Sequence, residues 1–222
     1  METNLANHKW TYIFFCLSLF LSACNQESGQ SEKASGSERT EDHSAHDMQA
    51  PSSNTMMDLM HQNMTAMHEA KMTGDLDRDF AALMALHHEG ALKMAQEEAE
   101  NGQDTMLVNM AKNTLATQKE EQEQLQKYAE SRQSAAGDTA ASRKLMQSME
   151  AAMADMDHTT AGTTDQHFAK LMGMHHQSGI DMAKAYLAGA KAPEIRKMAQ
   201  KIIDEQQNEK QKLDNWLEQH PQ

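Results

Sequence analysis

The sequence predicts an all-α protein, in which two repeated helical hairpins form a four-helix bundle and two Met-rich helices pack on its flanks. From about residue 55 to 219 the chain is dominated by Ala, Met, Leu, Glu, Gln and Lys, which favour helices, and Pro193 is the only proline within this range. The segment FAALMALHHEGALKMA starts at Phe80 and recurs 88 positions later as FAKLMGMHHQSGIDMA, starting at Phe168. Such a repeat indicates two copies of one structural unit.

The N-terminal segment is predicted to direct export and to take no part in the fold. An apolar run follows Lys9, is short for a membrane span, and ends in Leu-Ser-Ala-Cys at residues 21–24. This ending resembles the bacterial lipobox, in which the signal is cleaved before a cysteine that then carries lipid. We therefore expect a lipoprotein signal peptide over residues 1–23, lipidation of Cys24, and anchoring on the extracytoplasmic side of a bacterial membrane. The alternative is a transmembrane anchor that is never cleaved.

Residues 24–54 are predicted to form a disordered tether between the lipid and the domain. They are rich in Ser, Gly, Glu and Gln and contain almost no large apolar side chain that could be buried. Within this tether His43, His46 and Met48 are close in sequence. They are candidates for an auxiliary metal site, although short tails with histidine are also common without such a role.

The remainder is predicted to form two copies of a three-helix unit, over residues 55–131 and 132–222, that together make one bundle. In each copy a Met-rich helix is followed by a helix with the His pair and by a helix with a polar face. The expected ranges are about 55–72, 77–101 and 104–131 in the first copy, and 142–158, 165–190 and 194–219 in the second. Gly, Asn, Asp and Pro residues separate these segments, as expected at helix ends.

Composition limits the classes of function. The formal net charge is −13 and no Lys/Arg block is present, which disfavours nucleic acid as a partner. Of the two cysteines, Cys16 lies in the signal and Cys24 is expected to carry lipid, so the mature domain has no thiol. A cysteine-based metal site, redox centre or nucleophile is thereby excluded. With 20 methionines in the chain, any soft metal ligand must be Met.

The two helices with paired histidines each carry one stripe of apolar, Met and His residues. At about 100° per residue the stripes consist of Phe80, Leu83, Met84, His87, Ala91 and Met94, and of Phe168, Leu171, Met172, His175, Gly179 and Met182. His87 and His175 are predicted to face inward, while His88 and His176 lie at the edge, nearer the flanking Met-rich helix. A single inward His or Met is usually core packing. The recurrence of both groups in register favours a metal site.

The ligand types indicate which metal. Di-iron four-helix bundles bind their metal through a Glu-x-x-His motif. The corresponding positions here are Met84-x-x-His87 and Met172-x-x-His175, and the chain contains no Glu-x-x-His. Thioether and imidazole together favour copper, especially Cu(I), and silver would fit the same ligands. Free imidazole takes up a proton near pH 6.5, so copper binding is expected to weaken as pH falls through that value.

Further residues are candidates for supporting roles. Gln118 with Glu121, and Gln206 with Glu209, lie at matching places on the third helices, where they either hydrogen-bond the imidazoles or face water. The Met-rich helices carry a face that either packs against the bundle or acquires metal weakly. In the first copy this face contains Met57, Met60, His61, Met64, Met67 and His68. In the second copy it contains Met146, Met149, Met153 and Met156.

This set of motifs resembles a bacterial family long catalogued only as a domain of unknown function, with a ferritin-like architecture. Its members include a cyanobacterial periplasmic copper-binding protein. The resemblance covers residues 75–131 and 163–219. It implies copper binding at the motif positions Met84, His87, His88 and Met94, and at Met172, His175, His176 and Met182. The second copy departs from the first, with Ser178-Gly179 where the first has Gly90-Ala91.

We therefore expect a lipid-anchored, extracytoplasmic copper-binding protein that sequesters Cu(I), confers tolerance or delivers the ion, and does so without enzymatic turnover. Its expected partners are copper ions, the membrane, and a copper-export or chaperone protein. Two alternatives stay open at this point: a ferritin-like metal-dependent oxidase acting on Cu(I), and a purely structural envelope lipoprotein whose methionines only pack.

Overall fold

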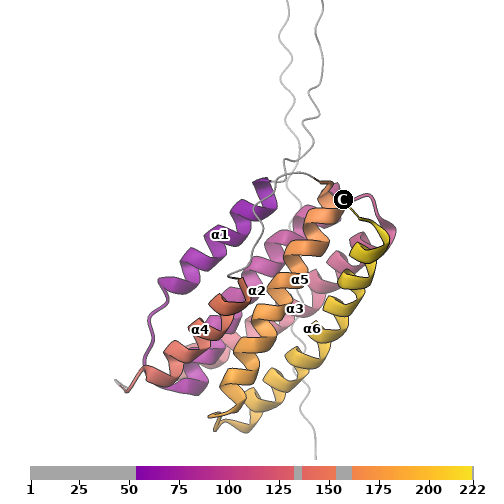
Figure 1. Cartoon of the computed structure of the whole chain (residues 1–222). Coiled ribbons are helices and arrows are strands. Elements are labelled where there is room, and N and C mark those ends of the chain that lie inside the picture. Colours follow the sequence, from indigo (N-terminus) through magenta and orange to yellow (C-terminus); the bar gives the residue numbers. More distant parts are fainter. Residues whose placement is uncertain (1–53, 133–136, 154–161, 222) are drawn as a thin grey trace, which may run out of the picture. The chain divides into compact units, whose positions relative to one another are not determined.

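The computed structural model describes residues 54–132, 137–153 and 162–221, which lie in one compact unit and contain no strand. Six helices follow one another: α1 (Asn54–His68), α2 (Leu76–Asn101), α3 (Thr105–Ser131), α4 (Ala140–Met153), α5 (Thr164–Leu187) and α6 (Pro193–Gln219). The predicted all-α class and the order of two three-helix units are confirmed (Figure 1). The predicted signal peptide, Cys24 and nearly all of the tether lie outside the described residues.

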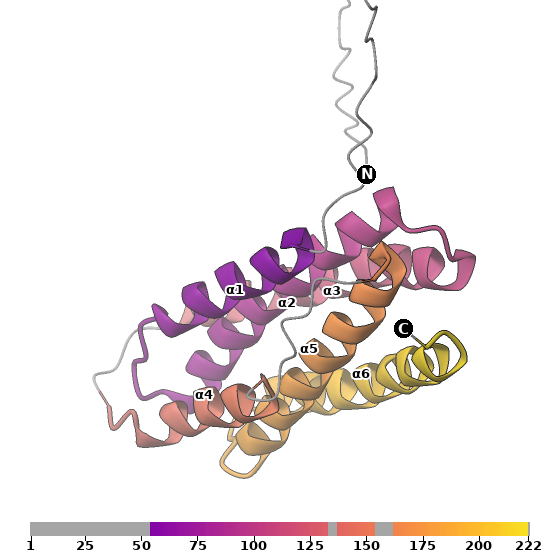
Figure 2. The same cartoon turned by 45° about the horizontal axis from the view of Figure 1, so that its top comes forward.

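The bundle consists of the hairpins α2/α3 and α5/α6, joined where α2 packs against α5. The Met-rich helices α1 and α4 lie along the outside of this bundle and contact both α2 and α5 (Figure 2). Among the described residues, no helix combines the length and the apolar character needed to cross a membrane.

The helices start close to the predicted residues, and capping side chains mark several of these starts. The Asp75 carboxylate caps α2, Asp104 caps α3, and Thr163 forms a capping box with Gln166 at α5. Pro193 opens α6, where its missing N–H costs nothing.

Helix α1 ends earlier than expected, at His68 instead of near residue 72. The buried Asp79 carboxylate accepts hydrogen bonds from the backbone N–H groups of Thr73 (3.0 Å) and Gly74 (2.9 Å) and from the Ser142 hydroxyl (2.6 Å). These contacts hold the α1–α2 connection in a non-helical path. Gly74 has a φ of +86°, and a Cβ there would lie 2.5 Å from the Gly137 backbone, so only glycine fits.

Each hairpin holds the turn of the other through a buried aspartate. Asp77, in the first turn of α2, accepts hydrogen bonds at 2.9 and 3.2 Å from the backbone N–H groups of residues 191–192, which precede α6. Asp165, in the first turn of α5, does the same at 2.9 and 2.7 Å for residues 103–104, which precede α3. The partners differ by 88 positions throughout, so the sequence repeat is also a structural pseudo-twofold relation.

A proton donor accompanies each of these aspartates. The Tyr186 hydroxyl donates to Asp77 at 2.7 Å. The residue 88 positions before Tyr186 is Glu98, which is fully buried and has no other hydrogen-bond donor beside its oxygens. Burial, together with the nearby Asp165 carboxylate, raises the pKa of Glu98 to about 9. Glu98 is therefore a neutral acid at pH 7, and it donates to Asp165 as Tyr186 donates to Asp77.

This pair predicts a loss of stability at alkaline pH. Because the pKa of Glu98 is raised from 4.5 to about 9 on folding, its contribution to stability is complete below pH 4.5 and is lost as pH rises through 9. The free energy of unfolding should fall by up to about 1.4 kcal/mol per pH unit within that window. Glu98→Gln keeps an N–H donor without a titrating proton and should remove this slope. Urea unfolding of both proteins at pH 7, 8 and 9 provides the measurement, and equal slopes would contradict the assignment.

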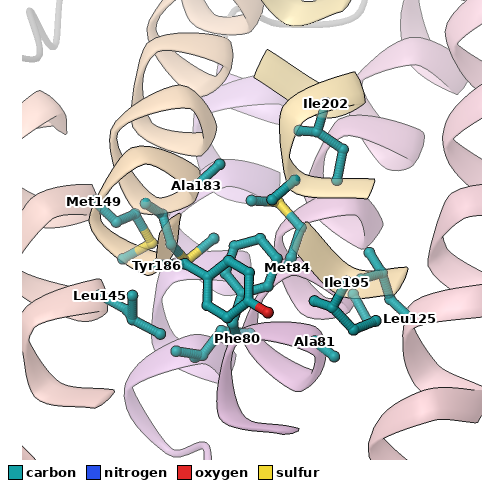
Figure 3. Close-up of a cluster of buried hydrophobic side chains, with 14 of the residues drawn as sticks. Phe80, Ala81, Met84, Leu125, Leu145, Met149, Ala183, Tyr186, Ile195 and Ile202 are labelled. Atoms are coloured by element: carbon teal, nitrogen blue, oxygen red, sulfur yellow. The ribbon is translucent and has the colours of Figure 1, made fainter. Parts of the chain in front are cut away.

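The core consists of two hydrophobic clusters, and along α2 and α5 the histidines lie between the residues that belong to one cluster and those that belong to the other. In the first cluster the rings of Phe80 and Tyr186 stack with centroids 4.0 Å apart, and Figure 3 shows Met84 and Met149 beside them. The second cluster is built around Phe168 and Leu107. Both clusters draw residues from both repeats, so neither repeat forms its core alone.

Candidate metal centre

The four histidines of the two doublets are buried where α2 meets α5, with exposed fractions of 1% for His87, 0% for His88, 3% for His175 and 0% for His176. The inward orientation predicted for His87 and His175 is confirmed. Their rings stack with centroids 3.7 Å apart and planes inclined by 9°.

The inner histidines are bonded reciprocally across the pseudo-twofold axis. The Nε2 atom of His87 lies 3.1 Å from the His175 carbonyl oxygen and 2.8 Å from the Ser178 hydroxyl, and Nε2 of His175 lies 2.9 Å from the His87 carbonyl oxygen. A carbonyl oxygen only accepts, so Nε2 carries the hydrogen in both rings. The lone pair of a neutral ring is therefore on Nδ1, and Nδ1 of His87 has no hydrogen-bond partner.

The outer histidines are bonded to carboxylates of the third helix in each repeat. His88 donates from Nε2 to Glu121 of α3, and His176 donates from Nε2 to Glu209 of α6, both at 2.9 Å. The Nδ1 atoms of both rings are buried without a partner. A metal-binding histidine commonly has this arrangement, in which a carboxylate fixes the tautomer and leaves the other nitrogen free.

The expected position of the outer histidines was wrong in one respect. They were predicted to lie nearer the Met-rich helices, but they are bonded to α3 and α6. Consecutive side chains on a helix point about 100° apart. Because His87 faces α5, the ring of His88 turns toward α3, the hairpin partner of α2.

Burial favours the neutral form of each of these groups, but their neighbours leave the inner histidines neutral and Glu121 charged. Burial, with the neighbouring histidines, lowers the pKa of His87 well below its ordinary value and that of His175 to about 3. Burial acts to raise the pKa of Glu121, but the hydrogen bond from His88 and then the hydrogen bond and charge of Lys201 outweigh it and lower the pKa to about 2. The inner rings are thus neutral far below pH 6.5, which corrects the expectation that protons compete for them near that value.

The two glutamines predicted as supporting residues are buried close to the histidines. Gln206 is 3% exposed and Gln118 is 4% exposed. Neither side-chain polar atom of Gln206 has a partner, and Oε1 of Gln118 has none. The small residue at position 179 makes room for Gln206, because a Cβ on Gly179 would lie 2.4 Å from its Oε1 and 2.8 Å from Cε1 of His87.

The structure does not bring each predicted set of two methionines and two histidines together. Met84 precedes His87 by one helical turn, but Met94 follows it by seven residues, or about 10 Å along the axis. Met84 and Met182 belong to the first hydrophobic cluster, whereas Met94 and Met172 belong to the second. All four are fully buried. Only Met84 and Met172 are close along their own helices to the histidines.

The auxiliary candidates are dispersed. Met60 and Met67 of α1 are buried in the second and first hydrophobic clusters, respectively, while Met64 is half-buried. His61 and His68 are exposed, and Nδ1 of His68 lies 3.4 Å from a Glu150 carboxylate oxygen. The methionine face of α4 is likewise buried at Met146, Met149 and Met153. His43, His46, Met48 and Met156 lie outside the described residues.

The repeat and its paired histidines can be compared with known proteins. A family model described as "Domain of unknown function (DUF305)" matches residues 20–129 and again residues 128–217. The chain belongs to this family. No curated protein matches the chain.

A solved structure of CopM in the silver-bound form, obtained by soaking, is similar to this DUF305 protein with a TM-score of 0.51. The two share 23% sequence identity over 66% of this chain and 98% of CopM. At this identity the likeness shows the fold, which CopM and the DUF305 protein have in common.

Each DUF305 copy contributes one histidine doublet, and the two doublets form a single buried unit. Within the described ranges, no three side chains of His, Cys, Asp or Glu are grouped so that they could hold a metal ion. Methionine sulfur is the other soft ligand type in this part of the chain, and Met84 and Met172 lie one helical turn before the inner histidines. Sequence reasoning missed Ser178, whose hydroxyl bonds both His87 and the His175 carbonyl; its only signal was the departure from Gly90 in the first repeat.

Proposed function

We propose that this DUF305 protein binds Cu(I), with Ag(I) as a substitute, and holds it without enzymatic turnover. One observation carries the proposal: three buried imidazoles, those of His87, His88 and His176, have an unpartnered Nδ1 atom while an oxygen holds their Nε2–H. An imidazole of this kind is ready to ligate a metal without a change of tautomer.

The methionines supply the soft partner for these nitrogens. Helical side chains lean over the turn that precedes them, so His87 and His88 cover the turn that carries Met84. His175 and His176 cover the turn of Met172 in the same way. A neutral imidazole with a thioether favours Cu(I) and Ag(I) over harder cations. The silver bound by CopM after soaking supports the same choice of ions for a related fold.

The proposed location is extracytoplasmic, with the protein attached to a bacterial membrane through lipid on Cys24. The lipobox-like residues 21–24 support this proposal. A copper protein held at a membrane would sequester Cu(I), confer tolerance to it, or pass it to an export or chaperone protein. Membrane fractionation of cells carrying a Cys24→Ala variant tests the anchor, because the variant should leave the membrane fraction.

A structural role is the second candidate, and one observation favours it. The reciprocal bonds from each inner ring to the opposite backbone carbonyl join α2 to α5, whether or not a metal binds. No comparable observation favours a Cu(I) oxidase. Oxygen consumption on addition of Cu(I) would nevertheless indicate turnover.

Metal competition tests the proposed function. The detergent-solubilised full chain is offered Cu(I), Ag(I), Cu(II), Zn(II) and Fe(II) without oxygen, and we expect the first two to be retained preferentially. Histidine ring ¹⁵N NMR should show the shift at Nδ1 and not at Nε2. Tighter retention of Fe(II) would contradict the copper assignment, and no retention of any metal would support the structural role.

A further inference from the structure

A cleft of about 170 Å³ lies between α3 and α6. Side chains of both helices line it, among them Gln118, Glu121, Glu205, Gln206, Glu209 and Lys212. We name it the α3–α6 cleft. It is large enough to hold several water molecules, each of which takes about 30 Å³ in the liquid.

The floor of the α3–α6 cleft is polar and unsatisfied. Gln206 lines the cleft and is 3% exposed, yet neither its Oε1 nor its Nε2 has a partner. Gln118 lines it too, with Oε1 unpartnered. Buried carboxamides normally have hydrogen-bond partners, so this floor is suited to contact with water or with a passing ligand.

The same floor adjoins the inner histidines. Gln206 and the His87 ring both approach the position of the missing Cβ of Gly179, which would be 2.4 Å from Oε1 of Gln206 and 2.8 Å from Cε1 of His87. Because Gln206 also lines the cleft, it connects the cleft to the histidine pair.

The walls of the α3–α6 cleft are joined to the outer histidines. Glu121 and Glu209 line the cleft and accept the Nε2–H of His88 and His176. Three carboxylates line it against one ammonium group, that of Lys212, and Lys201 pairs from outside the lining set with Glu121 and Glu205, which leaves one negative charge in excess. This charge favours the approach of a cation over that of an anion.

We propose that the α3–α6 cleft is the route by which a soft monovalent cation reaches the buried histidines, and that Gln206 is the group it passes. The proposal rests on the proposed function, since it concerns access to the same centre. On this route the Gln206 carboxamide, which lines the cleft and lies close to the His87 ring, replaces part of the ion's hydration shell.

Exchange kinetics test the route. Stopped-flow absorbance follows Cu(I) transfer from its bicinchoninate complex to the full chain, and release into excess chelator is followed in the reverse direction. In Gln206→Leu an apolar side chain of similar size blocks the route, so uptake and release should both slow by about tenfold or more. The dissociation constant, being their ratio, should stay within about threefold.

Two further variants are matched controls. Gln211→Leu places the same change at an exposed position of α6 and should leave both rates unchanged. Gln206→Glu keeps a polar group of the same length and should take up Cu(I) no more slowly than the unaltered chain. Because Gln206→Leu removes two unpartnered polar atoms, its thermal unfolding temperature should not fall.

The possible results distinguish a failure of the proposed route from a failure of the proposed Cu(I) binding. If the unaltered chain binds Cu(I) and Gln206→Leu exchanges it at the same rate, the route is overturned while the proposed function stands. Faster release without slower uptake would make Gln206 a ligand and would also overturn the route. If the unaltered chain takes up no Cu(I), the proposed function and the route are overturned together.

Discussion

Replacing His87 and His175 together by Gln should lower the affinity for Cu(I) by at least about 100-fold and leave the bundle folded. The Gln side chain carries an N–H near the position of Nε2, so it can still donate to the opposite backbone carbonyl, but it has no nitrogen lone pair in place of Nδ1. Loss of a ligand should cost at least as much as the 10- to 100-fold typical for loss of a group that orients one. Competition with a chromophoric Cu(I) chelator measures the change.

The choice of Gln matters because alanine would change two properties at once. His87→Ala with His175→Ala would also abolish binding, but it would open a cavity in the core, at a cost of about 2–5 kcal/mol for each large buried side chain. The exposed pair His61→Gln and His68→Gln is the control and should bind Cu(I) normally. Full affinity in the inner Gln variant would show that the bundle is a scaffold. Metal held instead by His43, His46 and Met48 would support the same conclusion.

The second large effect is expected at methionine. Met84→Leu together with Met172→Leu should weaken Cu(I) by about tenfold or more and Cu(II) much less, because only the soft ligand is lost. Leu has a similar volume, so the free energy of unfolding should change by less than about 1.5 kcal/mol per site. Parallel titrations with Cu(I) and Cu(II), with urea unfolding of the metal-free protein, provide the measurements.

The chain offers a closely matched control for this variant. Met94 and Met182 are as completely buried as Met84 and Met172, but each lies two turns from the nearest inner histidine of its own helix. Met94→Leu with Met182→Leu should therefore have the same effect on stability and none on Cu(I) affinity. An equal loss of affinity in both pairs would contradict the local pairing of Met84 with His87 and His88.

The sequence alone predicted most of the fold because the relevant signals are local. Helix-favouring composition, Pro193 as the only proline between residues 55 and 219, and the capping residues Asp75, Asp104 and Thr163 act on neighbouring backbone groups. The six helices follow from these signals with small errors at their ends. The error at α1 arose from Asp79, whose partners in the α1–α2 connection and on α4 cannot be identified from spacing.

The candidate site was predicted only in part. Helical periodicity correctly placed His87 and His175 on the inward face, since that face depends on one helix alone. Periodicity could not show that each ring bonds the carbonyl of the other, or that Glu121 and Glu209 would hold the outer rings. Spacing also grouped Met94 with Met84, although ten residues of helix separate them by about 15 Å.

By itself, then, the sequence determined the helices, the repeat, the inward histidine faces and the absence of thiols from the predicted mature domain. The tertiary structure decided which Nδ1 atoms stay unpartnered, which methionines lie near them, and how Asp77 and Asp165 hold the opposite turns. It also decided that an unsatisfied polar cleft adjoins the histidines. The physical reason is that these features depend on how α2 is aligned against α5. That alignment arises from packing between residues about 88 positions apart, which no local pattern specifies.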